Sequence, residues 1–119
     1  MSNPNLIAKS SNSLREAFGQ SITRIAKTNK KIVVLDADLA GGTGCHHFLK
    51  KYPKRFFQFG IAEQNMISAA AGMSSLGLVP FATTFAVFAL RAYEQARLSI
   101  SYSNLNVKII ASHGGLDTG

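Results

Sequence analysis

Short apolar runs alternate with longer segments of helical periodicity along this chain, and that alternation constrains the fold more than any other feature. Four runs are predicted to be strands: 32–35, 55–59, 78–83 and 107–112. None of them alternates polar and apolar residues, so each is expected to be covered on both faces. Helices are predicted between and beside them: 14–27, 46–51, 62–75 and 85–102. This order predicts an α/β fold with a mostly parallel sheet and helices on both faces.

The first helix has a recognisable start. Ser13 and Glu16 have the spacing of a capping box, in which each side chain binds the backbone N–H of the other residue. One domain is therefore expected over residues 13–119, with residues 1–12 as an N-terminal tail. A chain of 119 residues, 46% of them apolar, can bury one core and is too short for a second domain.

We expect a cytoplasmic protein without a membrane span. The first residues lack the apolar run of a signal peptide, and polar residues and glycines interrupt the longest uncharged stretch, 64–90. Cys45 is the single cysteine, so it cannot form an internal disulfide, which fits a reducing compartment.

The formal net charge of +7, from 13 Lys and Arg against 6 Asp and Glu, suits an anionic partner. Nucleic acid is not the expected partner, because the basic residues lie in short connecting segments without a basic stripe interleaved with aromatic residues. Sugar phosphates or a cofactor diphosphate remain as the anionic partners.

Four of the six carboxylates are expected at or just beyond strand ends, where open parallel sheets bind ligands: Asp36, Asp38, Glu63 and Asp117. The alternative is structural, since an Asp often forms a turn and the helix dipole favours an acid in a first helical turn. Glu63 differs from the others because its neighbours are apolar and its helix is expected to be buried nearly all round. Burial disfavours a charged carboxylate, so Glu63 is a candidate to share a proton with a ligand nitrogen.

Aromatic and histidine side chains offer further contacts. Phe85 and Phe88 are expected on one helical face, either as ordinary core or as a flat apolar slot for an aromatic ring. His113 follows the last predicted strand and precedes two glycines, where it can donate to a phosphate or a sugar hydroxyl.

Two further patterns carry weak signals. Cys45, His46 and His47 resemble a metal cluster only in composition, because consecutive helical residues point in different directions and no second ligand pair stands at zinc spacing. No metal site is expected in this chain. The glycine segment 41–44 is predicted to be a loop, and it follows neither the Walker A pattern nor a complete GxGxxG pattern.

Several spaced motifs, in one order, resemble the pyrimidine-binding domain of transketolase. They are Leu-Asp-Ala-Asp-Leu at 35–39, Tyr-Pro-Lys-Arg-Phe at 52–56, Phe-Gly-Ile-Ala-Glu-Gln-Asn-Met at 59–66, Thr-Phe-Ala-Val-Phe at 84–88, Arg-Ala-Tyr at 91–93 and Ser-His-Gly-Gly at 112–115. The match extends from about Leu14 to the last residue, and Gly-Ile-Ala-Glu-Gln is its most specific part.

The resemblance implies a thiamine-diphosphate-binding fold and assigns cofactor contacts. Glu63 matches the catalytic glutamate that hydrogen-bonds the cofactor's aminopyrimidine and promotes its imino tautomer. Phe85 and Phe88 match aromatic residues that pack on the pyrimidine ring, and the next aromatic position of that series falls on Arg91. Asp38 matches an acid near the cofactor and the subunit interface.

The resemblance also assigns substrate contacts. Arg15 and His113 match positions that contact the substrate phosphate, which suits a guanidinium and an imidazole, and His113 is expected to take part in catalysis. A serine of the family that touches phosphate falls on Gly42, so phosphate binding is expected to be weaker or to use Thr43.

The implied reaction is transfer of a two-carbon ketol unit from a ketose phosphate to an aldose phosphate. Such a site also needs a domain that holds the diphosphate through Mg²⁺ or Ca²⁺ with a Gly-Asp-Gly motif, which this sequence lacks. The implied partner is therefore a diphosphate-binding subunit or domain in a homo- or hetero-oligomer. Because the sequence stops at Gly119, before further active-site residues of the family, we expect a fragment or a truncated C-terminal subunit of a split bacterial transketolase, inactive by itself.

Other functions remain open from the sequence. 1-Deoxyxylulose-5-phosphate synthase and the β-type chains of 2-oxoacid dehydrogenases share the cofactor, and a noncatalytic assembly module would keep the fold. A basic nucleic-acid binder rests on net charge alone. The isolated chain is expected to associate or to be poorly soluble, because a sheet that ends at its fourth strand exposes an edge.

Overall fold

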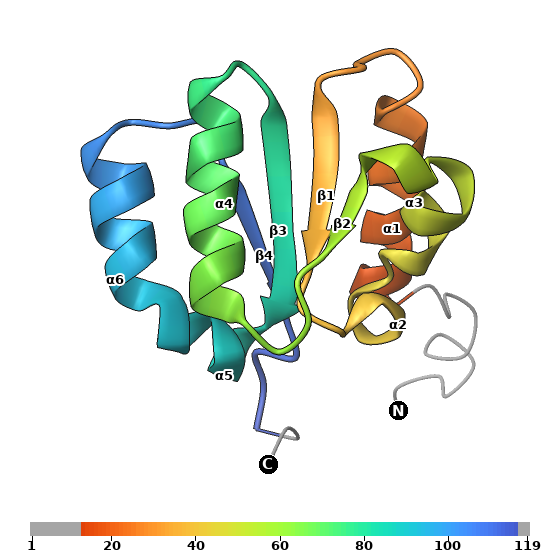
Figure 1. Cartoon of the computed structure of the whole chain (residues 1–119). Coiled ribbons are helices and arrows are strands. Elements are labelled where there is room, and N and C mark those ends of the chain that lie inside the picture. Colours follow the sequence, from red (N-terminus) through yellow and green to blue (C-terminus); the bar gives the residue numbers. More distant parts are fainter. Residues whose placement is uncertain (1–12, 117–119) are drawn as a thin grey trace, which may run out of the picture.

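Four parallel strands form one sheet in the order β2-β1-β3-β4 in the computed structural model, which describes residues 13–116 (Figure 1). The strands are β1 (Ile32–Asp36), β2 (Phe56–Gln58), β3 (Val79–Phe85) and β4 (Lys108–Ser112). In the pairing register, Val34 of β1 lies between Phe56 and Phe81. The predicted α/β fold with a parallel sheet is confirmed, whereas the expected tail, residues 1–12, and Asp117 lie outside the described residues.

Helices cover both faces of the sheet, as predicted. Figure 1 shows α4 (Glu63–Ser75) and α6 (Tyr93–Gln95) on one side, and α1 (Leu14–Ile25) and α3 (His46–Lys51) on the other. Strand β1 alternates its side chains between the two layers: Val33 and Leu35 pack in the core beneath α4, and Ile32 and Val34 pack in the core beneath α1 and α3. Every helix within residues 13–116 is too short or too polar to cross a bilayer.

The start of α1 forms only half of the expected capping box. The Ser13 Oγ accepts the backbone N–H of Glu16 at 3.4 Å, which caps the helix. The Glu16 carboxylate does not return to Ser13, because it lies 2.6 Å from Nε2 of His47 on α3. This side-chain hydrogen bond from His47 lowers the pKa of Glu16 and joins α1 to α3.

The segment predicted as a glycine loop is a short helix, α2 (Ala40–Thr43), that ends at Gly44 with φ of 80°. Gly44 needs this left-handed conformation and also packs against α1, where a Cβ on Gly19 would lie 2.0 Å from the Gly44 carbonyl oxygen. Two glycines therefore allow the backbones of α1 and α2 to touch, which fixes the start of α1 at the sheet edge.

Two helix predictions need correction. The segment 85–102 is not one helix: Phe85 ends β3, and α5 (Ala86–Ala89), a 3₁₀ turn (Leu90–Ala92), α6 and a π-helix (Ala96–Tyr102) follow. These changes of pitch let Ala92, Ala96 and Ile100 all reach the core beneath α4. Helix α4 is buried on one face only, since Gln64 and other polar residues along it are exposed.

Candidate functional site

The residues expected at the carboxyl ends of the strands do gather along one edge of the sheet. Figure 1 shows the start of α4, helix α5 and helix α2 at this edge, below the tips of β1 and β3. Glu63 begins α4, Phe85 ends β3 and His113 directly follows β4. The parallel topology therefore brings together residues that are 50 positions apart in the sequence.

Glu63 is buried, with 3% of its surface exposed, although it is the first residue of its helix. The unpaired N–H groups and the dipole of a helix N-terminus favour a carboxylate there. Its Oε2 lies 3.6 Å from Nη1 of Arg91, and the Gln64 side chain donates to the Arg91 carbonyl at 3.0 Å. The Arg91 side chain is 62% exposed, so only the carboxylate end of this pair is buried.

Phe85 and Phe88 form an aromatic surface at the same edge of the sheet. Their rings are stacked at 5.8 Å between centroids with 9° between the planes. They do not share a helical face, because Phe85 belongs to β3 and Phe88 to α5. Both side chains are half-buried, so neither is a fully buried core residue. The two rings are therefore partly exposed at this edge, and the flat apolar slot stays a prediction.

His113 connects this aromatic surface to a pocket. Its ring lies 3.9 Å from the Phe85 ring, and its Nδ1 lies 2.8 Å from the Ser112 Oγ. A hydroxyl that donates to Nδ1 leaves the proton on Nε2, where it can be donated to a ligand. The backbone of His113 has φ of 56°, a conformation that is uncommon outside glycine and that turns the chain away from β4.

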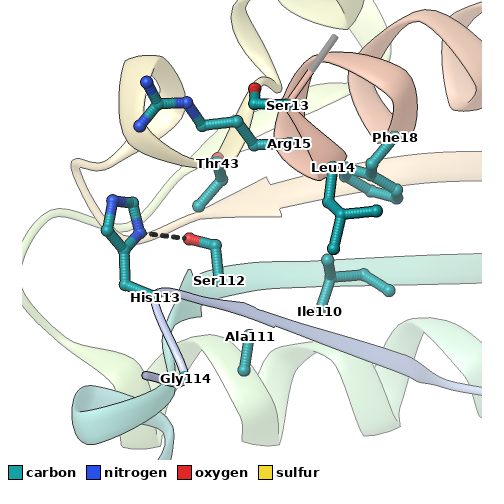
Figure 2. A pocket seen from close by; sticks show the side chains of 10 residues that line it. All are labelled: Ser13, Leu14, Arg15, Phe18, Thr43, Ile110, Ala111, Ser112, His113 and Gly114. Carbon is teal, nitrogen blue, oxygen red and sulfur yellow. Dashed lines mark hydrogen bonds between the residues drawn. The ribbon is translucent and has the colours of Figure 1, made fainter. Parts of the chain in front are cut away.

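The pocket has a volume of about 490 Å³ and lies between the start of α1, helix α2 and β4. Figure 2 shows Arg15 and His113 extending to the same side of it, with Thr43 close by. The structure thus brings together the two residues assigned to a substrate phosphate. The volume falls in the range of about 300–1,000 Å³ that small-molecule sites occupy.

Neither position 42 nor Thr43 offers a free hydroxyl group to a phosphate. A Cβ on Gly42 would lie 2.6 Å from Cε1 of Phe85, so a serine cannot replace this glycine unless the ring moves. The Thr43 hydroxyl donates to the Leu39 carbonyl at 3.1 Å, within α2. Arg15 and His113 are therefore the polar side chains best placed to contact a phosphate in this pocket.

The two aspartates after β1 have different environments. Asp36 is fully buried, and its Oδ2 accepts from Leu39 N at 3.0 Å and from Gln58 Nε2 at 2.8 Å. Asp36 therefore has the structural role that was the alternative to ligand binding. Asp38 is exposed with φ of 63°, and its N–H donates to the Gln58 Oε1. Gln58 was not singled out from the sequence, and its register position opposite Asp36 explains its role in tying β1 to β2.

Cys45 has no part in the edge site. Its side chain is buried in the core beneath α1 and α3, and this burial raises the pKa of the thiol. His46 and His47 lie instead on the surface of α3 beside Glu16.

Known proteins resemble this chain over most of its length. The model of the transketolase pyrimidine-binding domain matches residues 10–119. A Methanocaldococcus jannaschii protein named for the C-terminal section of transketolase is 45% identical over 107 residues, which are 89% of this chain and 34% of that protein. A 1-deoxy-D-xylulose-5-phosphate synthase of Clostridium perfringens is 38% identical over 99 residues, which are 83% of this chain and 16% of the synthase.

Solved structures of transketolases also resemble this chain. One described as a split-gene transketolase, an inactive β4 tetramer, has a TM-score of 0.74 and 55% identity and covers 82% of this chain and 33% of its own. The transketolase of Campylobacter jejuni has a TM-score of 0.73 at 22% identity, over 92% of this chain and 19% of its own, and supports the fold alone. This chain thus spans about a third or less of the length of these relatives. It belongs to the transketolase family, whose pyrimidine-binding domain it matches.

Proposed function

We propose that this chain supplies the pyrimidine-binding half of a thiamine diphosphate site in a transketolase, and that a diphosphate-binding subunit or domain completes the site. Glu63 carries the proposal, since it is a buried carboxyl at a helix start, 3% exposed, at the sheet edge where Phe85 and Phe88 stack. A flat heteroaromatic ring with a basic nitrogen fits that combination of groups. Family membership implies the use of thiamine diphosphate.

When bound, thiamine diphosphate supplies the carbanion chemistry that moves a two-carbon ketol unit from a ketose phosphate to an aldose phosphate. Glu63 would hydrogen-bond a nitrogen of the pyrimidine at a position from which water is largely excluded. Phe85 and Phe88 would set the plane of the ring by stacking. Arg91 would release Glu63 as the ring enters, a movement that its exposure allows.

The phosphate of the sugar would bind in the pocket that Arg15 and His113 line. A guanidinium forms strong, charge-assisted hydrogen bonds with phosphate oxygens, and a protonated Nε2 adds a second donor. The contact between His113 and Phe85 places this donor next to the proposed cofactor ring. His113 would therefore contact both the substrate and the cofactor side of the site.

The partner would cover an exposed apolar surface beside Glu63. Leu90 and Tyr93, on either side of Arg91, are exposed on the helical segments that follow β3, and Asp38 is exposed at the same edge as Glu63. The partner would also hold the Mg²⁺ that binds the diphosphate. We expect the isolated chain to self-associate through such surfaces in light scattering, and a monodisperse monomer would contradict this. The single cysteine, Cys45, is consistent with a cytoplasmic location.

Ketol transfer from xylulose 5-phosphate to ribose 5-phosphate tests the proposal. The chain is mixed with a candidate diphosphate-binding partner, thiamine diphosphate and Mg²⁺, and Glu63→Gln is compared with Glu94→Gln. Glu94 is an exposed glutamate paired with Arg97, so its variant controls for the loss of one charge. Glu63→Gln should lower the rate by about 10²–10⁴-fold, the usual contribution of proton transfer by a positioned group.

Three results separate the alternatives. Equal activity of both variants would favour a noncatalytic assembly module. Formation of 1-deoxy-D-xylulose 5-phosphate from added pyruvate and glyceraldehyde 3-phosphate, without ketol transfer, would assign the chain to the synthase relatives, one of which is 38% identical. Cofactor binding that Glu63→Gln weakens, without turnover of either kind, would keep the site and reject the substrates.

A further inference from the structure

Three potential metal ligands meet on the outer surface, away from the edge site. Glu16 comes from α1, and His46 and His47 come from the start of α3. One ligand atom from each side chain lies within 4.8 Å of the other two. The imidazole rings of His46 and His47 have their centroids 4.0 Å apart, and Nε2 of His47 lies 2.6 Å from Oε2 of Glu16. Helices α1 and α3 lie side by side in Figure 1.

We propose that Glu16, His46 and His47 bind one zinc-class divalent cation, with water completing the coordination. No second ligand pair stands at zinc spacing along the chain, but the fold supplies the third ligand, Glu16, from α1. Two imidazole nitrogens and one carboxylate oxygen form a ligand set that suits Zn²⁺ and similar transition metals. Metal sites with three protein ligands of these types keep an open position for water.

Small side-chain movements would complete the site. Ligand atoms at about 2.0–2.2 Å from zinc stand roughly 3.4 Å apart in a tetrahedral arrangement. The 2.6 Å contact between Glu16 and His47 must therefore open, and separations up to 4.8 Å must shrink by up to about 1.4 Å. The side chains of His47 and Glu16 are 33% and 34% exposed and His46 is exposed, so these rotations meet little packing resistance.

The basic side chains around the cluster disfavour metal ions that bind mainly through electrostatic attraction. A groove beside the cluster is lined by His47 and four basic side chains, Arg24, Lys27, Lys50 and Lys51. This positive field disfavours a hard cation such as Mg²⁺, which prefers several oxygen ligands. Bonds to imidazole nitrogen can overcome the repulsion for a transition metal. The proposed site is therefore separate from any Mg²⁺ that serves the cofactor.

A bound ion would act as a clamp between α1 and α3. It would link residue 16 to residues 46 and 47, close to the backbone contact of Gly19 with Gly44. Because the unfolded chain does not hold the three ligands together, binding would stabilise the folded state by mass action. Zn²⁺ should therefore raise the unfolding temperature of the chain, and excess Mg²⁺ should not.

Equilibrium dialysis of the full chain against Zn²⁺, with excess Mg²⁺ present, tests the proposal. We expect about one tightly held ion per chain, and at least about tenfold weaker binding in His46→Ala and in Glu16→Gln. His46 is exposed, so its variant should fold normally, and circular dichroism checks this. His113→Ala and Cys45→Ser are matched controls, because they remove the remaining imidazole and the single thiol.

The outcomes are distinct. Loss of Zn²⁺ binding in His46→Ala and Glu16→Gln with both controls unchanged supports the site. Binding lost in His113→Ala or Cys45→Ser would place the metal elsewhere and overturn the proposal. Zn²⁺ binding that is absent or displaced by Mg²⁺ would overturn it as well. In cobalt-loaded protein, visible absorption bands that disappear in His46→Ala would independently show nitrogen coordination.

Discussion

Gly19→Ala should destabilise the chain although it improves the helix by itself. Gly19 lies inside α1, where alanine is favoured over glycine by about 1 kcal/mol. The added methyl group, however, would lie 2.0 Å from the Gly44 carbonyl oxygen, 2.8 Å from its carbon and 3.1 Å from Cδ2 of His47. Helix propensity and tertiary packing therefore predict opposite signs for one substitution.

The size of the effect follows from the contact distance. Ordinary van der Waals contact begins at 3.4 Å, so α1 and the end of α2 must separate by about 1.4 Å. Overpacking costs about 1–3 kcal/mol, and the upper end applies because the obstacle is backbone. After the gain in helix propensity, the net loss is about 2 kcal/mol. In a chain of 119 residues this lowers the unfolding temperature by about 8 °C.

Gly72→Ala is the matched control. Gly72 lies inside α4, and a Cβ there would meet nothing within 4 Å. This variant should raise the unfolding temperature by about 4 °C through helix propensity alone. Thermal unfolding followed by circular dichroism measures both variants under one condition. If Gly19→Ala were as stable as Gly72→Ala, the close approach of α1 to α2 would be wrong.

One substitution and two measurements on Cys45 probe the layer formed by α1 and α3. The Arg55 guanidinium donates to the carbonyls of Ala26, Asn29 and Ile32 at 3.0–3.3 Å and stacks 4.2 Å from the centroid of the Tyr52 ring. Arg55→Lys should therefore cost about 1–3 kcal/mol in urea unfolding, and a loss no larger than that of Lys54→Ala would contradict these contacts. Burial raises the pKa of Cys45, so iodoacetamide should label its thiol slowly at neutral pH unless urea is present. Stability should also fall as the pH rises through the ordinary thiol range, because only the unfolded chain then ionises; rapid labelling of the native chain would refute its burial.

Much of the fold was predictable from local patterns. All four strands and the helices predicted at 14–27, 46–51 and 62–75 are present, because apolar runs and helical periodicity are local signals. The expectation that every strand is covered on both faces was wrong for the edge strands β2 and β4, which are partly exposed. The helix from 85 to 102 was predicted as continuous and is wrong in detail. Its changes of pitch arise from packing beneath α4, and no local propensity encodes that contact.

The candidate site, too, was predictable from the sequence only in part. The sequence determined that acids, aromatic residues and a histidine follow strands, and a parallel topology then brings them to one edge because all strands end there. Only the tertiary structure decided that Arg91 pairs with Glu63, that Gln58 holds Asp36, and that Glu16 joins His46 and His47. Each of these contacts joins residues at least 22 positions apart, and such pairs depend on how helices pack on the sheet rather than on spacing along the chain.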